Sequence, residues 1–362
     1  MNNELAKVFS KLAATYKKQS AVNDEMAKLF ARAAELCGNV RATTAQIGTN
    51  EQTAESLQDI IVDAENGDVT SILKLKKLAK KDMQAKAELE NLYYDGDEKN
   101  AVGTLVLRDG LKYIENGKFY HLQNITKVVL PESLVDIGNN AFQNCISLED
   151  IYFPPTLISI GASAFQDCAN LKQINLPDSV ASIGYSAFSG CTNLREVILP
   201  KGLTSISNSV FRDCSSLPKI EIPDSVTSIG GGAFASCANL KEIVLPKGLT
   251  EISNGIFYGC SSLSKIELPD SVTSINSGAF AGCTNLKEIV LPKSLTEIDY
   301  RVFYGCSSLL KIEIPDSVTS IALAAFENCT NLTSVTCSEE TKKLFKNSGG
   351  FDYNDLTWNI ID

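Results

Sequence analysis

The sequence predicts an α+β repeat protein in which an α-helical N-terminal segment precedes a solenoid built around a parallel β-sheet. Three observations support this fold class. Cysteine recurs every 23 residues from Cys145 to Cys329, and phenylalanine and proline follow the same period. Residues 1–95 lack this period and carry apolar residues at heptad spacing instead. A repeat of 20 to 50 residues is typical of a solenoid, because one unit buries its apolar face only by stacking on its neighbours.

One repeat, Leu240–Ser262, reads LKEIVLPKGLTEISNGIFYGCSS. In its first part Ile243 and Leu245 alternate with Glu242 and Val244, which is the period-2 pattern of a strand with one buried face. Proline ends this strand, LTEI supplies a second short apolar pair, and GIFYGC predicts a tight helical or 3-10 turn with its Phe and Cys inside. Stacked copies would place the strands about 4.8 Å apart in one parallel sheet.

The pattern LxxIxLPxxLxxIxxxxFxxCxx closely resembles the BspA-like class of leucine-rich repeats, over residues 105–337. This resemblance implies a right-handed, curved leucine-rich-repeat solenoid used for adhesion or protein recognition. It offers no catalytic residues to carry over.

Four segments follow from these patterns. Residues 1–95 are predicted to be a helical oligomerisation or anchoring segment, 96–104 a hinge, 105–337 a solenoid of about ten repeats, and 338–362 a C-terminal cap. The cap is expected to hold a short helix near Glu339 to Lys346 and a closing strand containing Trp358. Such atypical ends cover the core that the last coil of a solenoid would expose.

The heptad positions of the N-terminal segment allow two structures. An oligomeric coiled coil would bury one apolar stripe between copies of the chain. Alternatively, Gly-containing segments near residues 38, 48 and 67 would separate three helices that fold back as a small bundle. The residues predicted to mediate oligomerisation are Leu5, Val8, Leu12, Val22, Met26, Leu29, Leu36, Leu57 and Ile61.

Two outward rows run across the predicted strands. The position four residues before each proline alternates in charge, from Glu196 and Lys219 onwards, which favours neutralisation between neighbouring strands over a recognition role. The position two residues before each proline is apolar in alternate coils. Its candidate ligand-contact residues are Tyr152, Ile198, Val244 and Val290, although flanking Lys and Glu would also suit a solvated face.

No catalytic, metal or cofactor site is expected. The chain has one histidine, His121, and its cysteines form no CxxC pair that could close a tetrahedral zinc site. Cysteines aligned at one solenoid position are predicted to be buried, reduced thiols that act as small apolar side chains.

The net charge of −10 disfavours binding to nucleic acid, and no apolar stretch is long enough for direct membrane insertion. No signal peptide is apparent, so the chain is expected in the cytoplasm or on a larger particle such as a virion, which is compatible with surface exposure.

These patterns predict a non-enzymatic protein that presents a rigid leucine-rich-repeat surface to a protein or cell-surface ligand. A homo-oligomer through residues 1–95 would make this adhesion protein multivalent, as in a fibre on a virion or phage-like particle. The alternative is an intracellular protein–protein interaction scaffold with a monomeric helical docking domain.

Overall fold

The computed structural model describes residues 103–349 and 356–361. The chain divides into two compact units, one of residues 1–97, 104–109 and 127–130, and the other of residues 98–103, 110–126 and 131–362. The second unit contains the solenoid coils from residue 131 onwards. The helices and oligomerisation residues predicted within 1–95 lie outside the described residues, so the coiled coil and the bundle both stay predictions.

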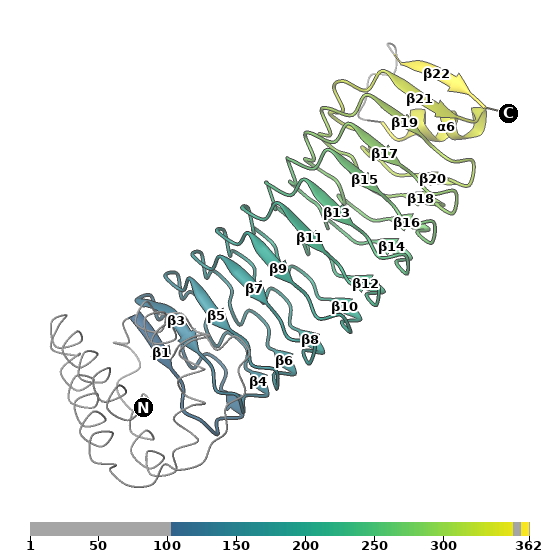
Figure 1. The fold of residues 1–362 in the computed structure, drawn as a ribbon. Coiled ribbons are helices and arrows are strands. Elements are labelled where there is room, and N and C mark those ends of the chain that lie inside the picture. The colour runs from purple at the N-terminus through teal and green to yellow at the C-terminus, as the bar shows by residue number, and fades with distance from the viewer. Residues whose placement is uncertain (1–102, 350–355, 362) are drawn as a thin grey trace, which may run out of the picture. The chain divides into compact units, whose positions relative to one another are not determined.

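Each repeat forms one coil with two short strands, which recur as two rows (Figure 1). Row A holds β1 (Gly103–Val106), β3 (Ile125–Val129), β5 (Asp150–Tyr152), β7 (Gln173–Asn175), β9 (Glu196–Ile198), β11 (Lys219–Glu221), β13 (Glu242–Val244), β15 (Lys265–Glu267), β17 (Glu288–Val290), β19 (Lys311–Glu313), β21 (Ser334–Cys337) and β22 (Thr357–Ile360). Row B holds β2 (Tyr113–Ile114), β4 (Asp136–Ile137), β6 (Ser159–Ile160), β8 (Ser182–Ile183), β10 (Ser205–Ile206), β12 (Ser228–Ile229), β14 (Glu251–Ile252), β16 (Ser274–Ile275), β18 (Glu297–Ile298) and β20 (Ser320–Ile321). The helix α6 (Glu339–Asn347) lies near the C-terminal end.

The strands pair in parallel with a register of one repeat, so Lys219 lies opposite Glu242 and Ile220 opposite Ile243. The parallel-strand solenoid is therefore confirmed, but the expectation of one continuous sheet is wrong. The LTEI segments form strands of their own. From β7 onwards, row A pairs as β7–β9, β11–β13, β15–β17 and β19–β21–β22.

Backbone hydrogen bonds support the paired steps of row A, although a longer bond of the same kind, from the Lys172 N–H to the Glu149 carbonyl at 3.3 Å, also joins the unpaired strands β5 and β7. At four of the paired steps, the residue before the second strand donates its N–H to the carbonyl of the residue before the first. These bonds are Arg195 to Lys172 at 2.8 Å, Lys241 to Pro218 at 3.0 Å, Lys287 to Ser264 at 3.1 Å and Thr333 to Leu310 at 3.0 Å. Because Pro218 has no N–H, the step from β9 to β11 cannot form this bond.

Phenylalanine and cysteine fill the core, as predicted. The rings stack from Phe119 to Phe345 with centroids 4.5 to 5.9 Å apart. Each repeat cysteine from Cys145 to Cys329 donates its thiol proton to the phenylalanine carbonyl of the preceding coil, at 3.1 to 3.4 Å. The core is thus continuous from coil to coil along the solenoid axis.

The turn that carries Phe and Cys needs left-handed backbone at two positions, the second residue before each Phe and the residue before each Cys. Glycine fills both positions around Phe257, at Gly255 (φ 55°) and Gly259 (φ 71°). Arg301 (φ 54°) occupies the first of these positions in a later coil, at the conformational cost that a Cβ brings there.

The C-terminal helix begins where the sequence predicts one. The hydroxyl of its N-cap residue, Ser338, accepts a hydrogen bond from the Thr341 N–H at 3.3 Å. Phe345 from this helix stacks on Phe326 with ring centroids 4.5 Å apart, and Trp358 meets Phe345 edge-on at 5.6 Å. Helix α6 and strand β22 therefore cover the last phenylalanine of the repeat series.

Candidate binding surface

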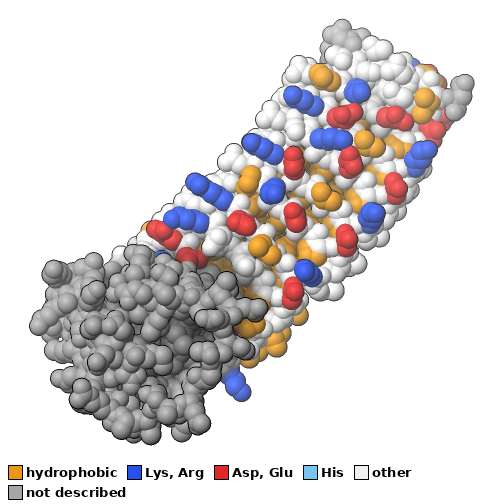
Figure 2. All heavy atoms as spheres, in the orientation of Figure 1, with side chains coloured by type: hydrophobic (Ala, Val, Ile, Leu, Met, Phe, Trp, Pro, Cys, Tyr) orange, Lys and Arg blue, Asp and Glu red, His pale blue; other side chains and the backbone are white. Residues whose placement is uncertain are grey.

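Row A presents an exposed face because its three-residue strands bury only their central residue. In β13, Ile243 is buried, whereas Glu242 and Val244 point outwards. Figure 2 shows basic, acidic and hydrophobic side chains interspersed on the face of the solenoid turned to the viewer. We call the outward side chains of β5 to β22, together with the residue that follows each row A proline, the row A face.

The structure places the four candidate ligand-contact residues at the same strand position. Ile198 is 47% exposed, Val244 77% and Val290 57%. Tyr152 is half-buried. Burial, and to a smaller extent the nearby Glu132 carboxylate, raises the pKa of its hydroxyl. Ile198, Val244 and Val290 are therefore large apolar side chains available to a partner, and their role in binding stays a prediction.

The charged row of this face has the predicted register but few of the predicted ion pairs. Lys311 lies 3.8 Å from Glu288 across neighbouring strands. Lys265 instead pairs with Glu267 of its own strand at 2.8 Å. That hydrogen bond raises the pKa of Lys265 and lowers the pKa of Glu267. Both pairs are solvent-exposed, so neutralisation between strands adds little stability.

A groove of about 1,090 Å³ lies on the C-terminal part of the row A face. Its floor includes the apolar residues Ile289, Leu291 and Ile312, and the candidate residue Val290 lies in its lining. Its charged lining residues are Asp270, Glu288, Lys293, Lys311, Glu313 and Asp316. A groove with an apolar floor and charged walls suits the side chains of an extended protein segment.

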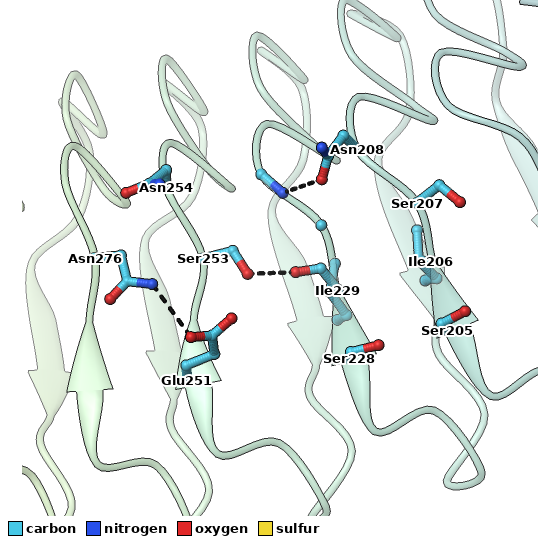
Figure 3. Close-up of a pocket in the computed structure, with 12 residues that line it drawn as sticks. Ser205, Ile206, Ser207, Asn208, Ser228, Ile229, Glu251, Ser253, Asn254 and Asn276 are labelled. Carbon is cyan, nitrogen blue, oxygen red and sulfur yellow. Dashed lines mark hydrogen bonds between the residues drawn. The ribbon is translucent and has the colours of Figure 1, made fainter. Parts of the chain in front are cut away.

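A smaller polar groove of about 450 Å³ crosses row B from β10 to β16 (Figure 3). Its polar side chains bond mainly within the solenoid. Asn208 Oδ1 accepts from the Gly231 N–H at 2.9 Å, and Ser253 donates to the Ile229 carbonyl. Since these groups already have partners, this groove offers a ligand less than the row A face does.

Sequence reasoning missed two features of the surface. The large groove involves Asn359 and Ile361, which follow the last repeat and carry no periodic signal. The second feature is an aromatic cluster in which the Arg301 guanidinium lies 4.9 Å from the Tyr300 ring centroid and 4.8 Å from that of Tyr304. The Tyr300-Arg301 dipeptide, next to a predicted turn, was the available signal.

The cysteines offer no reactive site on this surface. Burial raises the pKa of Cys145, Cys260 and Cys329 to about 12, so these thiols are protonated at neutral pH. In the part of the chain that the structure describes, no group of three or more His, Cys, Asp or Glu side chains could hold a metal ion.

The fold and its exposed face define a repeat protein of the parallel-strand solenoid class. The BspA type leucine rich repeat region matches in several copies, at residues 98–217, 159–266, 205–333 and 250–357, which together span more than half of the chain. The chain belongs to this BspA-type leucine-rich repeat family.

Several solved structures are similar to this chain. A leucine-rich repeat protein from Bacteroides ovatus is 23% identical, with a TM-score of 0.48, over 75% of this chain and 86% of that one. A leucine rich cell surface protein from Faecalibacterium prausnitzii is 26% identical, with a TM-score of 0.44, over 74% and 89%. The pneumococcal vaccine antigen PcpA is 18% identical, with a TM-score of 0.45, over 75% and 91%.

A search of curated proteins gives no match. Among the described residues, no helix is both long enough and apolar enough to cross a membrane.

Proposed function

We propose that this protein is a non-enzymatic binding protein that recognises proteins through the row A face. The observation that carries the proposal is the line of exposed Ile198, Val244 and Val290 that leads into the groove over β17 to β21. Exposed aliphatic side chains flanked by charges give a partner both apolar contact and charge-based selectivity.

The rigidity of the solenoid supports this role. Its strands, stacked phenylalanines and thiol hydrogen bonds hold the row A side chains at fixed spacing. Binding a partner therefore costs little conformational entropy in this surface. The groove of about 1,090 Å³ exceeds the usual size of a small-molecule pocket, which favours an extended protein segment.

The test compares two double variants of the full chain on a panel of immobilised cell-surface and extracellular-matrix proteins. Val244→Lys with Val290→Lys changes the row A face, and Thr250→Lys with Thr296→Lys adds the same charge next to row B in the same coils. We expect at least one ligand to lose about tenfold in affinity with the first pair and to keep its affinity with the second. Equal binding by both pairs, or no ligand on the panel, would overturn the proposal.

The adhesive, multivalent form of the proposal depends on residues 1–95. Its support is the heptad pattern, which would join several solenoids through one stalk, as in a fibre on a virion or phage-like particle. Light scattering on the full chain and on the Leu12→Glu/Leu29→Glu variant tests it. A multimer that the variant dissociates is expected. A monomeric full chain would favour the intracellular scaffold.

A further inference from the structure

Three outward positions of the row A face alternate from each coil to the next over six coils, from β9 to β19. Two of them alternate between acidic and basic residues, and the third alternates between apolar and acidic residues. The first strand position reads Glu196, Lys219, Glu242, Lys265, Glu288, Lys311. The third strand position reads Ile198, Glu221, Val244, Glu267, Val290, Glu313, and the residue after each proline reads Lys201, Asp224, Lys247, Asp270, Lys293, Asp316. All of these side chains are exposed.

The solenoid itself uses little of this alternation. Within residues 103–349 and 356–361, the ion pairs among these side chains are Lys311–Glu288 and Lys265–Glu267. The other charged side chains of the pattern, all within the described residues, form no ion pair with one another and can pair with charges on a partner. A partner that satisfied the first strand position and the position after proline would need opposite charges at the spacing of single coils in these two rows.

We propose that this partner is a second copy of the chain, bound face to face about a two-fold axis that runs parallel to the strands midway between β13 and β15. The inference rests on the proposed function, since it names a protein partner for the same face. Rotation about this axis keeps each strand position and reverses the order of the coils. A surface that recognises itself in this way forms an isologous interface.

In the first row and in the row after proline, the charges of the two copies then match at every coil. Each pair occurs twice because of the symmetry. In the first row Glu242 faces Lys265 of the second copy, Lys219 faces Glu288 and Glu196 faces Lys311. In the row after proline Lys247 faces Asp270, Asp224 faces Lys293 and Lys201 faces Asp316. In the middle row Val244, Val290 and Ile198 face Glu267, Glu221 and Glu313, so no like charges meet in any of the three rows.

The ends of the pattern at the two strand positions favour this register, whereas the row after proline continues with Asp178. At the first strand position the alternating charges are bounded by Gln173 on one side and Ser334 on the other, and at the third by Asn175 and Thr336. These neutral residues lie at equal distances from the axis between β13 and β15. The alternative axis, along the solenoid, would place Glu221 against its own copy and is disfavoured by that repulsion.

The matched area is large enough for a specific dimer. Six coils at about 4.8 Å each and about six residues of width give about 600 Å² per copy, or about 1,200 Å² in total, above the usual lower limit of about 1,000 Å². The coils from β9 to β19 follow one another along a nearly straight line in Figure 1, which lets two such faces meet over their whole length.

Zero-length cross-linking with a carbodiimide tests the arrangement on the full chain. The diagnostic products join Glu196 to Lys311 and Lys201 to Asp316. In one chain these partners lie five coils apart, about 24 Å, so a zero-length link between them must join two copies. Both products are expected in the dimer fraction at low salt, with a lower yield at high salt. Their absence would overturn the proposal, whether or not residues 1–95 oligomerise.

A charge swap separates contact between copies from neutralisation inside the chain. Glu242→Lys places two Lys side chains opposite each other, and the yield of the Glu196–Lys311 product should fall about tenfold. The double variant Glu242→Lys/Lys265→Glu restores opposite charges between copies while it places like charges on neighbouring strands. It should recover the yield to within about threefold of the unmodified chain.

Glu297→Lys on row B is the matched control and should leave the yield unchanged, while circular dichroism confirms that each variant is folded. The proposal would be overturned if the double variant gave no higher yield of the Glu196–Lys311 product than Glu242→Lys alone. That result leaves the ligand panel unaffected, so the proposed function and this inference can fail separately.

Discussion

The Cys237 thiol donates a hydrogen bond to the Phe211 carbonyl oxygen of the preceding coil at 3.1 Å. Both side chains are fully buried, and the same bond recurs along the repeats. The cysteine therefore joins two coils through a polar contact inside an apolar core. This role explains why a small residue with a donor, rather than alanine, occupies the position.

Replacing Cys237 with alanine should lower the free energy of unfolding by about 1 to 3 kcal/mol, because it removes a buried sulfur and leaves the Phe211 carbonyl with the Cys214 N–H alone as its donor. Urea unfolding of the full chain, followed by circular dichroism, measures the loss. Cys237→Ser keeps a donor and should lose less than Cys237→Ala if the hydrogen bond contributes more than the volume. An unchanged unfolding midpoint for Cys237→Ala would contradict this account.

Alkaline pH should destabilise the solenoid steeply. Burial raises the pKa of Cys145, Cys260 and Cys329 from 9.0 to about 12, so above about pH 9 the unfolded chain loses protons that the folded chain keeps. Stability is thus fully present below about pH 9 and falls towards pH 12, by about 1.4 kcal/mol per pH unit for each such thiol. Urea midpoints from about pH 8 to about pH 11 check this trend. Cys260→Ala should make the slope shallower, and an unchanged slope would count against the cysteines as its source.

Gly230→Ala should destabilise the chain by about 1 to 3 kcal/mol. An added Cβ would collide with Asn208, meeting its Oδ1 and lying 2.5 Å from its backbone nitrogen. Gly202→Ala is the control, since a Cβ there would have nothing within 4 Å. Thermal unfolding of the two variants should differ clearly in midpoint, and similar midpoints would show that the turn beside β12 relaxes freely.

Phe345→Ala should loosen the C-terminal coils more than the central ones. It removes the ring that stacks on Phe326 at 4.5 Å and supports Trp358 at 5.6 Å, at a cost of about 3 to 5 kcal/mol to the local packing. Hydrogen exchange should rise in β19 to β21 and stay unchanged in β9 to β13, because each coil contacts only its neighbours. Lys346→Ala is the comparison on the same helix. Uniform exchange along the solenoid would contradict a local role.

The sequence predicted the parts of the fold that depend on the period. Phe257 and Cys260 are buried because a residue repeated at one position of a stacked coil meets its own equivalents. The break of row A between β9 and β11 could not be read from that period, because it depends on backbone bonding, although the missing N–H of Pro218 was a local signal. The exposure of Val244 was predictable from strand alternation. The groove was not, because Asn359 reaches it from outside the repeats.

The pairing of row A strands in twos has a mechanical consequence. Paired steps such as β11–β13 and β15–β17 are held by ladder hydrogen bonds. The intervening steps depend on row B, the core, side-chain contacts and the backbone hydrogen bonds of the turns, such as that from the Phe211 N–H to the Ala233 carbonyl at 2.9 Å. Under tension along the solenoid axis, the intervening steps would therefore have fewer contacts to resist separation than the paired steps. The unit that yields as one piece would be two coils, or 46 residues, so a pulled chain would lengthen in increments twice the length of its sequence repeat.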